Sequence, residues 1–102
     1  MDEIQNEIEL KIQNNLKTQE ELQKQMALLP KGHINILYRK EKGYYYLTYR
    51  NGKKICNDYL GPVGKTDTTK IINDLAQREK CKKEIKYLKE EYKQLKKLIK
   101  RK

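Results

Sequence analysis

Residues 43–54 read GYYYLTYRNGKK, and this stretch decides the fold that the sequence predicts. Aromatic and β-branched residues favour a β-strand, and Asn51-Gly52 is typical of a two-residue hairpin loop because both residues tolerate positive φ. Residues 33–40 (HINILYRK) and 53–60 (KKICNDYL) have the same strand-like composition on either side. The sequence therefore predicts a three-stranded antiparallel meander within residues 30–64.

The positions of the two loops assign each side chain to a face of this sheet, because side chains alternate along a strand. A loop at Asn51-Gly52 predicts these pairs: Arg50 with Lys53, Thr48 with Ile55, Tyr46 with Asn57 and Tyr44 with Tyr59. A first loop at Glu41-Lys42 then collects a largely apolar face of Ile34, Ile36, Tyr38, Tyr45, Leu47, Tyr49 and Cys56, which we expect to lie against helices. A three-residue first loop would instead move Arg39 and its strand neighbours to the opposite faces.

The other face mixes aromatic rings, amides and cations, and it carries Asn35, Leu37, Arg39, Tyr44, Tyr46, Thr48, Arg50, Lys53, Ile55, Asn57 and Tyr59. Basic groups displace the counterions of a phosphate backbone, while tyrosines offer hydroxyl donors or stacking surfaces. We therefore predict a nucleic-acid-binding site at Arg39, Tyr44, Tyr46, Thr48, Arg50 and Lys53. In the alternative interpretation the tyrosines only build a small sheet, and the two basic residues only form an exposed turn.

A helix is predicted on each side of the sheet. Residues 1–29 have no glycine, no proline and an apolar stripe of Ile4, Ile8, Ile12, Leu16, Leu22, Met26 and Leu29. Residues 65–102 begin with three candidate caps, Thr66, Asp67 and Thr68, and contain a coiled-coil seam of Ile85, Leu88, Tyr92, Leu95 and Ile99. We expect one structural domain of the α+β class: an N-terminal helix, a three-stranded β-meander and a long C-terminal coiled-coil-like helix.

Charge is distributed unevenly along the chain. Lys and Arg outnumber Asp and Glu by 24 to 14, a net charge of +10, of which residues 1–29 contribute −3, residues 30–64 +5 and residues 65–102 +8. Complementary charge favours pairing of the acidic and basic helices within one chain, and a homodimer through the seam from Ile85 to Ile99 is the alternative. The net charge favours an anionic partner, with nucleic acid the leading candidate.

The composition argues against several other classes of function. The 102 residues are 36% apolar, contain no serine and hold only one histidine and two widely spaced cysteines. We therefore expect no catalytic site, no metal site and no cofactor, and we interpret Cys56 and Cys81 as reduced thiols. No apolar run approaches a membrane span and the first residues are acidic, so we expect a cytoplasmic protein without a membrane partner.

The segment GYYYLTYRNGKK, followed by YLG and a predicted helix, resembles the three-stranded, AP2-like arm-binding domains of tyrosine-recombinase integrases over about 30 residues. It is also similar to short bacterial proteins that join a YYYL, YR, GKK and YLG pattern to a coiled coil. The integrase resemblance implies a sheet that enters the major groove of DNA, with base or backbone contacts at Tyr44, Tyr46, Thr48 and Arg50 and backbone contacts at Lys53. No recombinase catalytic domain follows in these residues, so we expect no recombination by this chain alone.

Two hypotheses of function follow from these patterns. The first is a non-catalytic nucleic-acid-binding protein of a mobile element or phage, which uses the sheet face and the basic helix and prefers DNA, with RNA open. The second is a protein-binding adaptor or a phage anti-defence inhibitor of the anti-CRISPR type that acts on a nucleoprotein. Binding to duplex DNA, single-stranded DNA and RNA across a salt series distinguishes the two.

Overall fold

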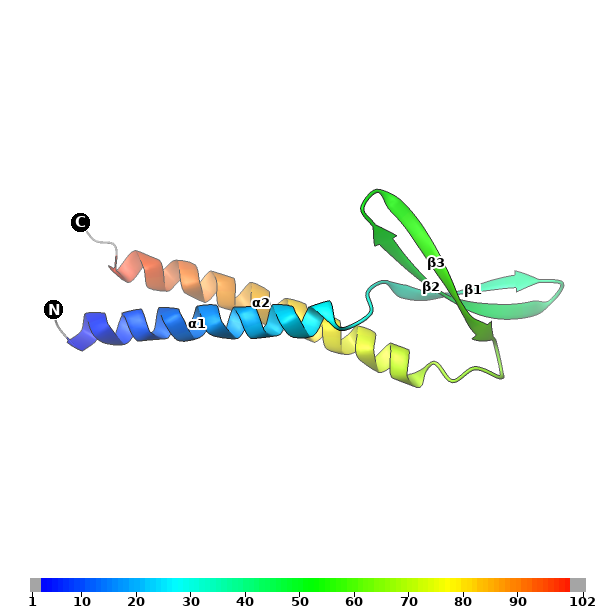
Figure 1. Cartoon of the computed structure of the whole chain (residues 1–102), viewed down its shortest axis with the longest axis horizontal. Helices are drawn as coiled ribbons and strands as arrows, with labels where there is room; N and C mark the ends of the chain where they lie inside the picture. Colours follow the sequence, from blue (N-terminus) through cyan, green and yellow to red (C-terminus); the bar gives the residue numbers. More distant parts are fainter. Residues whose placement is uncertain (1–2, 100–102) are drawn as a thin grey trace. The chain divides into compact units, whose positions relative to one another are not determined.

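The computed structural model describes residues 3–99, which form two compact units. The elements follow in the order α1 (Glu3–Ala27), β1 (His33–Arg39), β2 (Lys42–Asn51), β3 (Lys54–Pro62) and α2 (Thr69–Ile99) (Figure 1). The predicted α+β architecture is therefore confirmed. Asp2 and residues 100–102, which the sequence analysis included in its two helical segments, lie outside the described residues.

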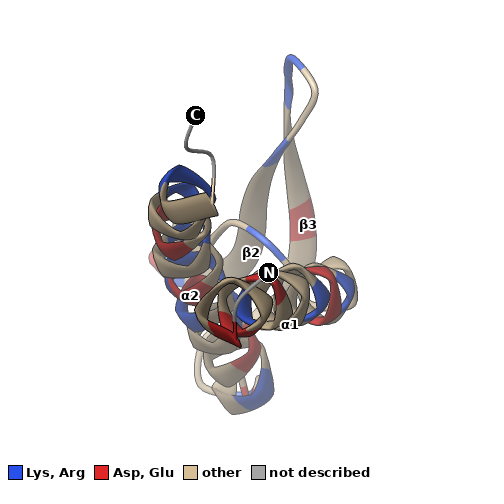
Figure 2. Ribbon diagram, turned by 90° about the vertical axis from the view of Figure 1, so that its left-hand side faces the viewer, with Lys and Arg blue, Asp and Glu red and all other residues tan. Residues whose placement is uncertain are grey.

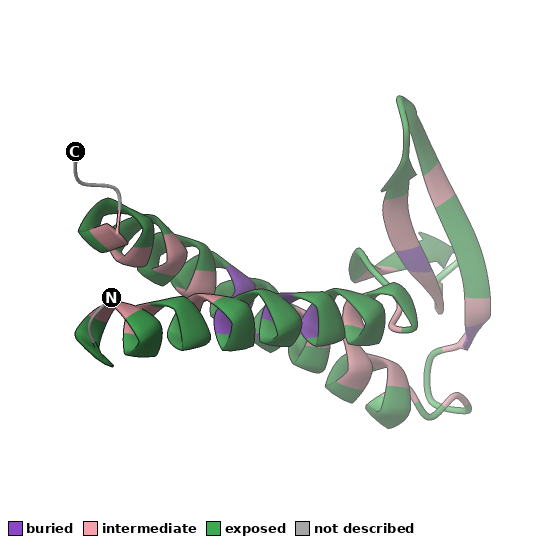
Figure 3. Cartoon of the chain, turned by 60° about the vertical axis from the view of Figure 1, so that its left-hand side comes forward, coloured by how far each residue is buried: buried purple, intermediate pink, exposed green. Residues whose placement is uncertain are grey.

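The first unit pairs α1 with the part of α2 that follows Arg78. The helices run antiparallel, because Gln25 near the end of α1 contacts Cys81, whereas the earlier Asn15 contacts Leu88. Figure 3 shows buried positions, in purple, on both helices of the pair. The centre of the buried cluster is Leu22, Cys81 and Ile85, with Met26 and Leu88 packed against them. The predicted packing of the first helix on the last is confirmed, and the predicted seam of α2 faces α1 of the same chain.

The predicted apolar stripe of α1 is wrong at two positions. Ile4 and Leu16 are 69% and 45% exposed, whereas the polar residues Asn15 and Gln19 are buried. The real seam takes steps of four and three through Ile8, Ile12, Asn15, Gln19, Leu22 and Met26. Repeated steps of four drift around a helix of 3.6 residues per turn, so Leu16 turns away from the partner helix.

Asn15 satisfies its amide by binding both helices. Its Nδ2 donates to the Leu88 carbonyl and to Glu91 Oε1, each at 2.9 Å, and its Oδ1 accepts from Gln19 Nε2 at 2.6 Å. A buried polar layer of this kind lowers the stability of a coiled coil but specifies its register and its number of strands. We infer that this layer aligns α1 with α2 within one chain.

Replacing this layer by leucine (Asn15→Leu with Gln19→Leu) is expected to raise the melting temperature of the helical pair and to produce additional oligomers. The apolar pair removes two buried amides together, so neither is left without a partner. Circular dichroism and sedimentation velocity measure the two effects. A double variant that is more stable but keeps the parent's distribution of oligomers would show that the polar layer does not specify pairing. Asn14→Leu with Gln23→Leu, which makes the same two changes at exposed positions of α1, provides the control.

The second unit, residues 29–78, contains the sheet and the first turns of α2. The strand order is β1-β2-β3 with both pairs antiparallel, which confirms the predicted meander. Asp67 caps the first turn of α2, because its Oδ1 accepts the Thr69 N–H at 2.9 Å. Hydrogen bonds from the Thr69 side chain and from this N–H hold the pKa of the Asp67 carboxyl below its usual value. The Arg78 guanidinium donates to the Leu29 carbonyl at 3.0 Å and joins the two ends of the unit.

Both predicted loop positions are wrong by one residue. The second loop is Gly52-Lys53, with Asn51 paired to Lys54, and the first is Lys40-Glu41, with Arg39 paired to Lys42. Gly52 supplies the positive φ of 67° that a hairpin needs at its first loop position, so Asn51 remains in the strand. The first loop uses positive φ at two non-glycine residues, 49° and 70°, which composition did not indicate.

These shifts change the cross-strand partners but not the faces. Moving each loop by one residue shifts the pairing by two, and side chains alternate with a period of two. Thr48 therefore lies opposite Asn57 instead of Ile55, and Tyr46 lies opposite Tyr59 instead of Asn57. Ile34 and Ile36 pair with Leu47 and Tyr45 on the face that the sequence predicted to be apolar. That the helices cover this face stays a prediction.

Candidate nucleic-acid interface

We call the opposite side of the sheet the basic-aromatic face. It is formed by alternate residues of the three strands, namely Asn35, Leu37, Arg39, Lys42, Tyr44, Tyr46, Thr48, Arg50, Ile55, Asn57 and Tyr59. Five of the six predicted site residues lie on this face, and the sixth, Lys53, lies in the turn next to it. Lys42 and Tyr59 were absent from the predicted site. Lys42 was assigned to a loop, and Tyr59 was assigned to this face but not to the site.

Three tyrosine rings gather on this face. The register of the second hairpin places Tyr59 directly opposite Tyr46, and a bulge follows, because Tyr45 pairs with Gly61 and Leu60 is an extra residue in β3. The Tyr59 ring lies 5.4 Å from the Tyr46 ring and 6.3 Å from the Tyr44 ring, with interplanar angles of 58° and 49°. Tilted rings at these separations attract one another, and their faces are not stacked together.

A chain of side-chain hydrogen bonds crosses all three strands beside the tyrosines. Asn35 Nδ2 donates to Thr48 Oγ1, and that hydroxyl donates to Asn57 Oδ1, each at 2.7 Å. Both bonds join the Thr48 hydroxyl to the neighbouring strands, so Thr48 links β1, β2 and β3 beside the tyrosines. Its predicted contact with nucleic acid stays a prediction.

Two hollows adjoin the tyrosines within the sheet unit. The first has a volume of about 320 Å³ and is lined by Leu37, Arg39, Tyr44, Tyr46 and Tyr59. The second has a volume of about 590 Å³, and its lining includes Tyr38, Lys42, Tyr44 and Lys65. Tyr44 therefore belongs to both hollows, and each has at least one cation in its wall.

Cations stand at both ends of the basic-aromatic face. Arg39 and Lys42 lie directly opposite each other at the first turn, where like charges destabilise the strand pair. Neither forms an ion pair with another described residue. Arg50 and Lys53 lie at the second turn, where Figure 2 shows basic residues in blue at the tip of the β2–β3 hairpin. Lys42 and Arg50 are eight positions apart on the extended strand β2, which corresponds to a distance of about 27 Å.

The two carboxylates of the sheet are not among the alternate strand positions of this face. Glu41 is in the first turn, where it lines the second hollow with Lys42 and Lys65, and Asp58 lies opposite Leu47 on the other face. There the Asp58 carboxylate raises the pKa of the Tyr49 hydroxyl above its usual value, with smaller contributions from burial and from Cys56. Within the described strands, the basic-aromatic face thus carries three cations, Arg39, Lys42 and Arg50, and no acidic side chain.

A second basic surface lies on α2 in the helical unit. Lys82, Lys86, Lys89, Lys93 and Lys96 follow steps of four and three, which place them in one stripe about 21 Å long. Lys93 Nζ lies 3.9 Å from Glu90 Oε2, and Lys96 Nζ lies 5.7 Å from the centre of the Tyr92 ring. Two ion pairs, Lys70 with Asp74 and Lys93 with Glu90, lie within α2, and the charge pairing of α1 with α2 stays a prediction.

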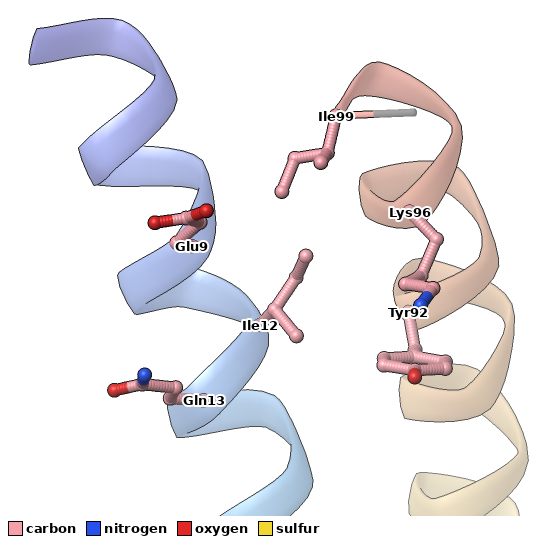
Figure 4. A pocket seen from close by; sticks show the side chains of 6 residues that line it. All are labelled: Glu9, Ile12, Gln13, Tyr92, Lys96 and Ile99. Atoms are coloured by element: carbon pink, nitrogen blue, oxygen red, sulfur yellow. The ribbon is translucent and has the colours of Figure 1, made fainter. Parts of the chain in front are cut away.

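The helical unit also contains a groove of about 530 Å³ between α1 and α2. Figure 4 shows Ile12 and Ile99 pointing into the gap from opposite helices, with Tyr92 and Lys96 beside them on α2. Glu9 and Gln13 complete the lining. The groove therefore lies along the predicted seam, between the buried cluster and the ends of the two helices at Glu3 and Ile99. Self-association through Ile85, Leu88, Tyr92, Leu95 and Ile99 stays a prediction.

Among residues 3–99 the structure shows neither a metal site nor a membrane-spanning helix. No group of three or more His, Cys, Asp or Glu side chains there could hold a metal ion. Neither of the two described helices has the length and apolar character needed to cross a membrane. Both cysteines are free thiols, with Cys81 buried and Cys56 partly exposed.

Comparison with known proteins identifies a family. Residues 1–70 match the family model described as a domain of unknown function (DUF6788), which is well over half of the 102 residues, so the chain belongs to that family. The match includes α1, all three strands and therefore the whole basic-aromatic face. No curated protein and no solved structure matches the chain.

Proposed function

We propose that this member of the DUF6788 family is a non-catalytic nucleic-acid-binding protein that uses the basic-aromatic face as its principal contact surface. The observation that carries the proposal is the gathering of Arg39, Lys42 and Arg50 with three tyrosines on one face that has no carboxylate. Such a face attracts a phosphate backbone, because it presents positive charges and has no carboxylate that would repel the phosphates.

The opposed pair of Arg39 and Lys42 supports an anionic partner more specifically. Two cations placed directly opposite each other across β1 and β2 cost folding free energy. A phosphate bound between them would offset that repulsion and accept charge-assisted hydrogen bonds from both side chains. The free energy lost in folding the sheet would then be recovered on binding.

The lysine stripe of α2 provides a second surface for the same kind of partner. Its five ammonium groups lie along one flank of a straight helix, which suits non-specific contact with a phosphate backbone. DNA is the preferred nucleic acid because of the resemblance to integrase arm-binding domains, which also suggests a mobile element or phage. A protein-binding adaptor, including one of the anti-CRISPR type, becomes the better hypothesis if no nucleic acid is bound.

Binding of the purified chain to DNA is expected to weaken steeply with salt. Contacts from Arg39, Lys42 and Arg50 to three phosphates predict a loss of affinity of roughly 40-fold between about 50 and 200 mM salt. Arg39→Ala with Arg50→Ala should reduce the slope of log affinity against log salt by about two. Fluorescence anisotropy on labelled duplex DNA, single-stranded DNA and RNA measures both quantities.

A matched control distinguishes the effect of the basic-aromatic face from the effect of net charge alone. Lys17→Ala with Lys24→Ala removes two exposed cations from α1, so it lowers the net charge equally without touching the sheet. If this control reduced the slope as much as the sheet variant did, the basic-aromatic face would not be the binding surface. Lys86→Ala with Lys93→Ala reports the contribution of the lysine stripe, and absence of binding to all three nucleic acids would refute the proposed function.

A further inference from the structure

The two hollows of the sheet unit define the form of nucleic acid that the face can accept. Their volumes, about 320 and 590 Å³, lie in the lower part of the range of sites for small molecules. They are therefore the right size for single planar groups and too small for a double helix. Because both hollows include Tyr44, groups bound in the two would be neighbours.

The walls of the hollows select an aromatic group joined to an anion. In the first hollow the three rings are tilted by 49° and 58° and do not stack on one another, so ring surface remains for a ligand. Tyr59 is 56% exposed. The second hollow extends from Tyr44 around the first turn to Tyr38, which belongs to the other face of the sheet and is 71% exposed. Arg39 lines the first hollow, and Lys42 and Lys65 line the second together with one carboxylate, Glu41, so both hollows have net positive charge beside the rings.

We propose that the basic-aromatic face binds single-stranded nucleic acid, with adjacent unpaired bases in the two hollows that share Tyr44. This inference rests on the proposed function and specifies its ligand. The bases stack on tyrosine rings, while the phosphates that follow them meet Arg39, Lys42 and Lys65. In a blunt duplex the base faces are already stacked on one another, so only the backbone would reach the face and both hollows would stay unused.

The bulge in β3 shapes the second hollow. Without the extra residue Leu60, Gly61 would lie opposite Tyr44. With it, Pro62 lies opposite Tyr44, and Pro62 and Val63 line the second hollow. Gly43 contributes as well, because a Cβ at this position would lie 3.0 Å from the Tyr38 ring and 3.1 Å from Val63.

The test compares a labelled oligothymidine with a blunt duplex that has the same number of phosphates. We expect the single strand to bind at least tenfold more tightly at equal salt. Tyr44→Leu should weaken single-strand binding about tenfold and leave duplex binding within twofold, because base stacking on one ring is lost. Tyr44→Phe keeps the ring and should retain affinity within twofold. Tyr87→Leu on α2, where Tyr87 is 68% exposed, is the matched control.

The outcomes distinguish this inference from the proposed function. If the duplex bound as tightly as the single strand, and Tyr44→Leu matched the parent while Arg39→Ala with Arg50→Ala lost affinity, the face would bind a duplex backbone and the inference would be wrong. If thymidine monophosphate bound as tightly as the oligonucleotide, the hollows would form a nucleotide site and not a track for a strand. If nothing bound, both proposals would fail. Circular dichroism confirms that each variant is folded before its affinity is compared.

Discussion

Ile85→Ala is expected to lower the free energy of unfolding of the helical unit by about 3 kcal/mol. Ile85 is 7% exposed, and with Leu22 and Cys81 it forms the centre of the cluster that joins α1 to α2. Shortening it removes apolar contact and leaves a cavity between two helices whose spacing is held by Asn15. Because domains are stable by only about 5–15 kcal/mol, this one change should remove a large share of the stability.

Urea unfolding followed by circular dichroism at the helical minimum measures the effect. Ile4→Ala is the matched control, since it is the same substitution in the same unit at a residue that is 69% exposed. Its effect should remain below about 1 kcal/mol. Equal losses from the two variants would contradict the assignment of Ile85 to the core of the helical pair.

Gly32→Ala is expected to destabilise the sheet unit by about 3 kcal/mol or more. Gly32 has a φ of 109°, which an L side chain rarely adopts. A Cβ there would overlap the Thr48 carbonyl oxygen and lie 2.8 Å from Tyr49 Cβ. The start of β1 would have to move away from β2, and this movement would disturb the bond from Asn35 to Thr48.

Gly52→Ala provides the comparison for Gly32. It also has a positive φ, 67°, but no heavy atom lies within 4 Å of the position that its Cβ would take. It should cost only about 1 kcal/mol, from the backbone conformation alone. Thermal unfolding and amide hydrogen exchange of β1 and β2 measure both variants, and a Gly32→Ala protein as stable as Gly52→Ala would show that the start of β1 adapts without loss.

The two basic surfaces illustrate how far local patterning predicts a candidate site. Arg39, Arg50 and the three tyrosines were assigned to one face by alternation alone, and a shift of two residues in both hairpins left that assignment intact. The same shift changed the predicted partner of Thr48 from Ile55 to Asn57. Its partners Asn35 and Asn57 are set by register, which a loop motif predicts less reliably than it predicts a hairpin.

The sequence by itself determined the order of the elements, the meander and the two sides of the sheet, because these depend on the periodicity and turn chemistry of neighbouring residues. Only the tertiary structure decided which residues meet. The register of the second hairpin places Tyr59 opposite Tyr46, and the buried Asn15 replaces Leu16 in the helical seam. Both outcomes depend on contacts between segments far apart in the chain, where cross-strand pairs and amide hydrogen bonds outweigh local preference.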